Sequence, residues 1–159
     1  MVLQMTKFIY KMESILQIKY KMEDQAKTAY GNAHAKLIME EKKLEELINK
    51  REYYKEKLTN LMQSNLKILD IKQCENDIEI VKYYIKLQQV EVKKAEQQLE
   101  AARIRLNNAM IERKTHENLK EKAFEAFMLE YEAEQRKEID ELVSFQYNNP
   151  TDDQEEDNG

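Results

Sequence analysis

The chain has 159 residues, 36% charged and 42% hydrophobic, so its apolar side chains suffice for a narrow seam between helices rather than for a broad globular core. Five acidic residues near the C-terminus account for the whole net charge of −5, and the neutral remainder excludes the basic surface typical of nucleic-acid-binding proteins. With two glycines and one cysteine, the chain forms neither a glycine-rich phosphate loop nor an internal disulfide.

The first predicted helix covers about residues 5–63. Its apolar residues recur in alternating steps of three and four, which is the spacing of a coiled-coil seam. With Lys19 as a polar member, this predicted seam comprises Phe8, Met12, Ile15, Met22, Ala26, Ala29, Ala33, Leu37, Leu44, Leu47, Tyr54, Leu58 and Leu61. Two consecutive four-residue steps around Ala33 predict a stutter beside Gly31, which would locally unwind the supercoil.

A turn is predicted at about residues 63–77, followed by a second helix at about 77–145. Asp70 with Gln73, and Asn76 with Glu79, each have the spacing of a capping box at a helix start. The second seam runs through Ile78, Val81, Ile85, Val92, Ala95, Leu99, Ala102, Leu106 and Ala109, and continues less regularly through Leu119, Ala123, Ala126 and Ile139. Neither glycine nor proline occurs between Gly31 and Pro150, so other turns are not expected.

These elements predict an all-α fold in which residues 1–147 form an antiparallel coiled-coil hairpin and residues 148–159 form a disordered acidic tail. In such a hairpin the numbers of facing residues have a nearly constant sum. Three large apolar pairs give 143: Leu37 with Leu106, Leu44 with Leu99, and Leu58 with Ile85. The register is therefore predicted to centre near residue 71. A structural homodimer, with a continuous helix pairing with a second antiparallel copy, would join the same residues and remains an alternative.

Catalytic and metal-binding chemistry is not expected. His34 and His116 lie far apart in sequence, and His116 with Glu112 and Glu117 is interpreted as part of a solvated helix face. The first residues lack the pattern of a secretory signal, and no segment approaches the roughly 20 apolar residues that cross a bilayer. We expect a cytoplasmic protein without cofactor or metal.

Two surface features suggest binding. Tyr53, Tyr54, Tyr83 and Tyr84 form two adjacent pairs, in each of which one ring is expected to join the seam while the other points outward. The start of the first helix, residues 7–27, is mildly basic with an apolar stripe, which suits docking on an acidic ring or on a membrane surface.

The segment FIYKMESILQIKYKMEDQAKTAYGNA, residues 8–33, resembles the start of the flagellar export protein FliJ family. The segment EQRKEIDEL, residues 134–142, is similar to the closing motif of that family. Between them, the family's spaced pattern is matched by Arg103, Leu106, Ala109, Glu112, Arg113, Lys114, Glu117 and Leu119. The resemblance covers about residues 5–145.

The resemblance implies a stalk-like, non-enzymatic coiled coil of the flagellar type III protein export apparatus, and thus a role in flagellum biogenesis, motility and chemotaxis. Such a protein would bind and activate a hexameric export ATPase of the FliI type. It would link this ring to an export gate protein of the FlhA type, and family members also bind export chaperones. It would reach the cytoplasmic face of the membrane only through these partners. The equivalent stalk of an injectisome remains an alternative.

The resemblance also suggests which residues bind these partners. The end that carries both termini would enter the ATPase ring, with contacts at Phe8, Lys11, Lys19, Arg136 and Lys137. The gate-binding surface would comprise Leu47, Tyr54, Tyr83, Leu87 and Val90. Lys50 stands where an aromatic residue is often found in the family, which is a departure from the pattern.

Overall fold

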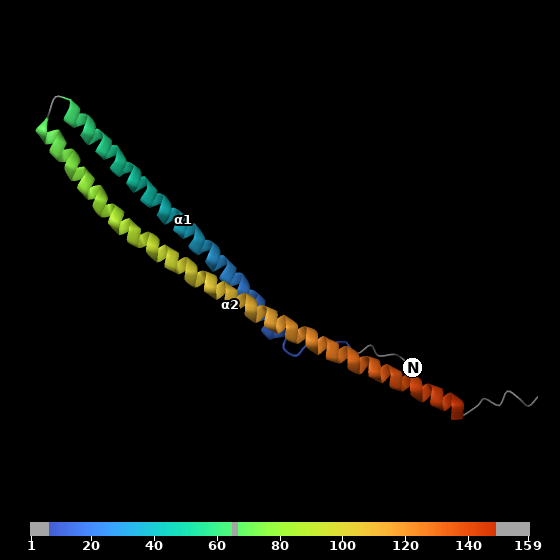
Figure 1. The fold of residues 1–159 in the computed structure, drawn as a ribbon. Coiled ribbons are helices and arrows are strands. Elements are labelled where there is room, and N and C mark those ends of the chain that lie inside the picture. Colours follow the sequence, from blue (N-terminus) through green and yellow to red (C-terminus); the bar gives the residue numbers. More distant parts are fainter. Residues whose placement is uncertain (1–6, 65–66, 149–159) are drawn as a thin grey trace, which may run out of the picture. The chain divides into compact units, whose positions relative to one another are not determined.

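Two long helices make up the computed structural model, which describes residues 7–64 and 67–148. Helix α1 is Glu13–Gln63 and helix α2 is Ile68–Asn148 (Figure 1). The helices pack against each other as a hairpin, and the described residues contain no strand. The predicted all-α hairpin is confirmed. Most of the predicted acidic tail, residues 149–159, lies outside the described residues.

The two helices begin at other residues than the sequence patterns suggested. Residues 7–10 are not helical, and α1 starts where the Glu13 amide donates a hydrogen bond to the Tyr10 carbonyl, with an N to O distance of 3.2 Å. Helix α2 starts well before residue 77, and the Asp70 amide donates to the Lys67 carbonyl at 3.0 Å. Asp70 thus lies in the first turn, where its carboxylate interacts favourably with the exposed amide dipoles. The second capping-box spacing falls inside the helix.

Tertiary contacts divide the chain into two compact units. The hairpin unit is residues 19–112, and the terminal unit combines residues 1–18 with residues 113–159. The two units are described separately below. Each contains a part of both helices, because the boundaries fall within α1 and α2.

The hairpin unit has a narrow seam of mostly small and branched apolar side chains. On α2 the buried residues follow steps of three, four and seven, as the second predicted seam required up to residue 109. These residues are Cys74, Ile78, Val81, Ile85, Val92, Ala95, Ala102 and Ala109. The buried residues of α1 in this unit are Ala26 and two carboxylates, Glu23 and Glu40.

Three predicted apolar members of the α1 seam before Ala26 were wrong, whereas its polar member Lys19 is half-buried. Met12, Ile15 and Met22 are 41%, 37% and 44% exposed. Their neighbours Leu16 and Glu23 are buried instead, at 2% and 5% exposure. The prediction thus selected apolar residues that lie next to the seam. The regular alternation of three-residue and four-residue steps continues instead through the buried carboxylate of Glu23.

No stutter is required at Gly31 either. Tyr30 is half-buried, as are Ala33 and Leu37, so steps of four, three and four connect Ala26 with Leu37. The heptad repeat is therefore continuous through this part of α1.

The predicted register was also wrong. The Cys74 Sγ donates to the Tyr54 carbonyl at 3.2 Å, and the Gln88 amide donates to the side chain of Glu40; the numbers in both pairs sum to 128. This sum differs from the predicted 143 by about two heptads. A shift by whole heptads brings the same stripes face to face again, so the apolar pattern alone does not distinguish these registers. The early start of α2 selects the lower sum.

In the terminal unit, the seam is largely polar. Arg113, His116 and Lys120 follow one another at seam spacing on α2, and all three are half-buried. The Lys120 ammonium lies 2.8 Å from a carboxylate oxygen of Glu13 on α1. The interpretation of His116 as part of a solvated face was therefore wrong, because its Nδ1 is buried and accepts or donates no hydrogen bond within the described residues.

Beyond this polar seam, aromatic rings hold the start of the chain against α2. The ring of Phe8 lies 5.3 Å from the rings of both Phe124 and Phe127, measured between centroids. The Phe127 ring in turn stacks on Tyr131. From residue 136 to residue 148, every side chain of α2 is exposed.

The predicted continuation of the second seam toward the C-terminus was mostly wrong. Leu119 and Ile139 are 45% and 57% exposed, and Ala126 is exposed as well. Ala123 alone among the four predicted members is half-buried. Helix α2 has 81 residues and α1 has 51, so the end of α2 extends beyond the length that α1 can cover.

Candidate docking surfaces

An exposed apolar stripe runs along α2 in the hairpin unit. Ile80, Tyr83, Leu87 and Val90 follow one another in steps of three, four and three, and their exposed fractions are 45%, 60%, 47% and 51%. Residues at this spacing share one face of a helix. We call this set the α2 stripe. It is separate from the seam, whose members Val81 and Ile85 are buried between the helices.

The predicted gate-binding residues are divided between the α2 stripe and the seam. Tyr83, Leu87 and Val90 lie together on the stripe, whereas Leu47 and Tyr54 are half-buried in α1. Ile80 was not predicted, although its three-residue spacing from Tyr83 would have identified it.

One of the two tyrosine pairs has the expected arrangement, in which one ring joins the seam and the other points outward. Tyr54 is half-buried while Tyr53 is 61% exposed, and their rings are 5.5 Å apart. Tyr83 and Tyr84 are both exposed, because the seam passes through Val81 and Ile85 on either side of them. Of these four phenol rings, one is therefore half-buried and three are available for contacts with a partner.

A second exposed surface is the C-terminal segment, which we define as residues 136–148 of α2. It carries Ile139, Leu142, Val143 and Phe145 with exposed fractions of 57%, 57%, 59% and 65%. Bare apolar side chains at this density on one helix are typical of a surface that binds another helix or a protein groove.

The predicted ATPase-binding residues have different environments. Lys11, Arg136 and Lys137 are exposed, and the last two begin the C-terminal segment. Phe8 belongs to the aromatic cluster, and the Lys19 ammonium forms an ion pair with Glu112 at 2.9 Å. These two residues therefore have intramolecular contacts, as their places in the predicted first seam required.

Three carboxylates are stabilised in their charged form. Hydrogen bonding from Gln88 lowers the pKa of Glu40 below its usual value, and hydrogen bonding from Lys120 does the same for the pKa of Glu13. The Arg103 guanidinium holds the pKa of Glu100 low in the same way. The two cross-helix contacts connect α1 with α2 within their own units, so they add polar specificity to the seam.

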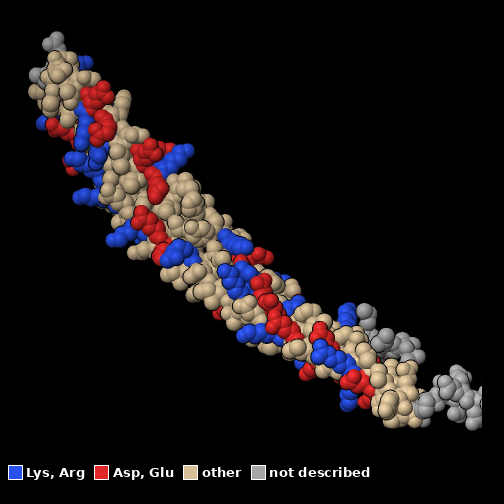
Figure 2. Space-filling view, turned by 45° about the vertical axis from the view of Figure 1, so that its right-hand side comes forward, with Lys and Arg blue, Asp and Glu red and all other residues tan. Residues whose placement is uncertain are grey.

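Positive and negative side chains are interspersed on the face seen in Figure 2, in keeping with the many ion pairs between residues three or four apart on one helix. Such surface pairs contribute little to stability. Among the described residues, no three His, Cys, Asp or Glu side chains are grouped so that they could hold a metal ion. The surfaces described above are suited to binding other proteins.

Comparison with known proteins gives a family and a fold. The family model described as flagellar FliJ protein matches residues 8–152. A solved structure of the YscO homologue CT670 from Chlamydia trachomatis is similar with a TM-score of 0.62 and 20% sequence identity, covering 89% of this chain and 96% of the other. No curated protein matches the chain.

The described residues contain no helix with the length and apolar character needed to cross a membrane.

Proposed function

The chain belongs to the flagellar FliJ protein family and is a component of a type III export apparatus, and from this premise we propose that it is a non-enzymatic stalk that binds and activates the export ATPase ring. Its second proposed role is to link this ring to the export gate protein. It would act in the cytoplasm, at the membrane face where the export apparatus stands.

The observation that carries this proposal is the C-terminal segment. It is helical along its whole length, every side chain in it is exposed, and its four large apolar residues have no cover from α1 among the described residues. Leaving these side chains in water is unfavourable, so a partner that covers them gains binding free energy. A ring of ATPase subunits with a central opening is a partner that can surround a single helix.

A stalk activates a ring only through unequal contacts. Subunits in different nucleotide states present different surfaces to a central helix, and a helix that binds one state better shifts the equilibrium toward that state. Ile139, Leu142 and Val143 share one face of the segment, whereas Lys137, Asp140 and Glu141 lie on the opposite face. The segment is thus asymmetric around its axis, as this mechanism requires.

The α2 stripe is the proposed surface for the gate protein. Tyr83, Leu87 and Val90 are exposed together on it, and Ile80 extends it by one turn. Leu47 and Tyr54 are half-buried in α1, so they would offer the gate only part of their side chains. Export chaperones are further proposed partners, without an assigned surface.

The test is stimulation of the purified export ATPase by the full chain. The variant Arg136→Glu with Lys137→Glu should lose most of the stimulation, at least about fivefold, because charge reversal at an interface places like charges together. Both residues are exposed, so the helical signal in circular dichroism should not change.

The matched control reverses two exposed lysines elsewhere on α2, Lys93→Glu with Lys122→Glu. It carries the same change of charge and should stimulate normally. Normal stimulation by the Arg136 and Lys137 variant would contradict ring docking through the C-terminal segment.

An injectisome stalk is the second candidate, and the likeness in fold to a YscO homologue is the observation that favours it. The two candidates differ in the system that the protein serves. Deleting the gene in its own organism should abolish flagella and swimming if the flagellar role holds. Intact flagella with loss of secretion through an injectisome would support the second candidate.

A further inference from the structure

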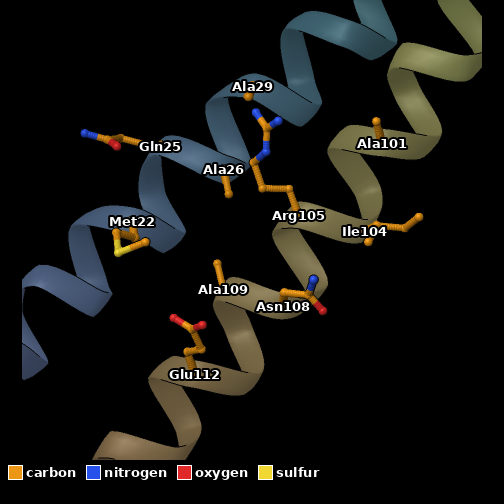
Figure 3. A pocket seen from close by; sticks show the side chains of 10 residues that line it. All are labelled: Met22, Gln25, Ala26, Ala29, Ala101, Ile104, Arg105, Asn108, Ala109 and Glu112. Atoms are coloured by element: carbon orange, nitrogen blue, oxygen red, sulfur yellow. The ribbon is translucent and has the colours of Figure 1, made fainter.

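A shallow groove lies between α1 and α2 in the hairpin unit (Figure 3), with a volume of about 650 Å³. Its floor contains Ala26 and Ala109, which are 4% and 9% exposed. Because these side chains are small, they leave room above them for another side chain. Met22 and Ile104, both nearly half exposed, add apolar surface at the sides. The groove can therefore receive an apolar helix face.

One positively charged side chain of the groove lacks an acidic partner in the part of the chain that the structure describes. Arg105 extends from α2 toward Ala29 of α1 (Figure 3), and it has no ion pair or hydrogen-bond partner among the described residues. The nearby Arg103 differs, because its guanidinium lies 2.6 Å from Glu100. The acidic residue of the groove, Glu112, is already bonded to Lys19. A ligand that fits this groove therefore presents apolar side chains together with a carboxylate.

The C-terminal segment has this chemistry. Ile139, Leu142 and Phe145 recur in steps of three, so they lie on one face of α2, and Glu138 lies on the same face because it precedes Leu142 by four residues. All four side chains are exposed. Glu138 has no ion pair among the described residues, so its carboxylate is available to a guanidinium from elsewhere.

The same molecule cannot bring these two features together. Residues 104–112 of the groove and the C-terminal segment belong to one continuous helix, and no glycine or proline between them would allow the helix to fold back. We propose that the C-terminal segment of one copy docks in the groove of a second copy, with Glu138 facing Arg105. A twofold axis makes this exchange reciprocal and closes the dimer.

This inference is independent of ring docking, but it has a consequence that rests on the proposed function. The segment that docks in the groove of the second copy is the segment proposed to enter the ATPase ring. The dimer would then keep the segment covered until the ring competes for it. Self-association and stimulation are measured separately, so failure of one proposal is distinguishable from failure of the other.

The test is the mass of the full chain by sedimentation equilibrium over a range of concentrations. The wild-type chain should pass from monomer, near 19.1 kDa, to dimer as its concentration rises. Arg105→Glu should weaken dimerisation at least about tenfold, because it places two carboxylates together. The control Lys93→Glu makes the same change of charge at an exposed position outside the groove and should dimerise as wild type.

A charge exchange makes the test specific. Combining Arg105→Glu with Glu138→Arg restores opposite charges at the contact and should recover dimerisation. A labelled peptide of residues 134–148 should also bind the wild-type chain, with weaker binding to Arg105→Glu. Monomeric mass at all concentrations, or equal dimerisation of wild type and Arg105→Glu, would overturn the proposal.

Discussion

The hairpin unit and the terminal unit use the same two helices in different ways. In the hairpin unit, α2 contributes eight buried residues, all of them apolar or cysteine, to a continuous seam. In the terminal unit, successive seam positions carry Arg113, His116 and Lys120, and every side chain of α2 is exposed from residue 136 to residue 148. The hairpin unit therefore gains stability from burial along α2, whereas the terminal unit leaves the apolar side chains of the C-terminal segment available for a partner.

The largest expected effect comes from a test that substitutes the same residue type in both units. Ile85 is 5% exposed in the hairpin unit, and Ile139 is 57% exposed in the terminal unit. Ile85→Ala should lower the free energy of unfolding by about 2–4 kcal/mol, because it removes buried methyl groups and leaves a cavity. Ile139→Ala should change it by less than about 0.5 kcal/mol. Urea unfolding followed by circular dichroism measures both.

Ile85→Ala should mainly reduce stability, whereas Ile139→Ala should mainly reduce binding. Ile139→Ala should weaken contacts of the C-terminal segment while the fold is unchanged. Similar losses of stability in both variants, at concentrations where the chain is monomeric, would mean that the C-terminal segment is covered within one molecule and that the comparison between the units is wrong.

A second test concerns the register of the hairpin unit. Glu40 and Gln88 form a polar layer in the seam, and such layers restrict which registers a coiled coil can adopt. Replacing both by leucine removes this restriction and makes this layer of the seam apolar. A second population shifted by about two heptads should then appear, although most molecules keep the original register because the turn is unchanged.

Distances between spin labels measure the two populations. Labels at the exposed positions 41 and 89 lie beside the Glu40–Gln88 layer and should be close in the wild type. Labels at 41 and 103 should become close only in the shifted register. A single short distance between 41 and 89 in the double leucine variant would mean that the turn alone determines the register.

The difference between these registers explains which parts of the fold the sequence could predict. The seam from Ile78 to Ala109 was predictable, because burial of one helix face requires apolar residues at heptad spacing. Its partner positions on α1 were not, because a heptad pattern repeats after each shift by seven residues. The phase before Ala26 was missed for another reason, namely that Glu23 is buried while the apolar Met22 is not.

The candidate surfaces were predictable to a smaller extent. Tyr83, Leu87 and Val90 were proposed from the family resemblance, and the structure exposes them together. The apolar residues of the C-terminal segment were missed, because their exposure depends on how far α2 exceeds α1, and hence on the position of the turn. Phe8 was assigned both to the seam and to a partner, since an aromatic residue near a helix start suits either role, and it packs within the terminal unit.

The smallest expected effect is a dependence of stability on pH in the acidic range. The pKa of Glu40 is lower in the folded chain than its ordinary value near 4.5, because Gln88 donates a hydrogen bond to the charged carboxylate. The contribution of this group to stability is therefore fully present above pH 4.5 and is lost as the pH falls through the lowered pKa. Glu40→Gln should flatten the decline of the melting temperature in this range, while Glu45→Gln, a change at an exposed carboxylate of the same helix, should leave it as in the wild type. Melting curves between pH 7 and pH 3 measure the difference, and parallel declines in the two variants would mean that the polar layer does not stabilise the charged form of Glu40.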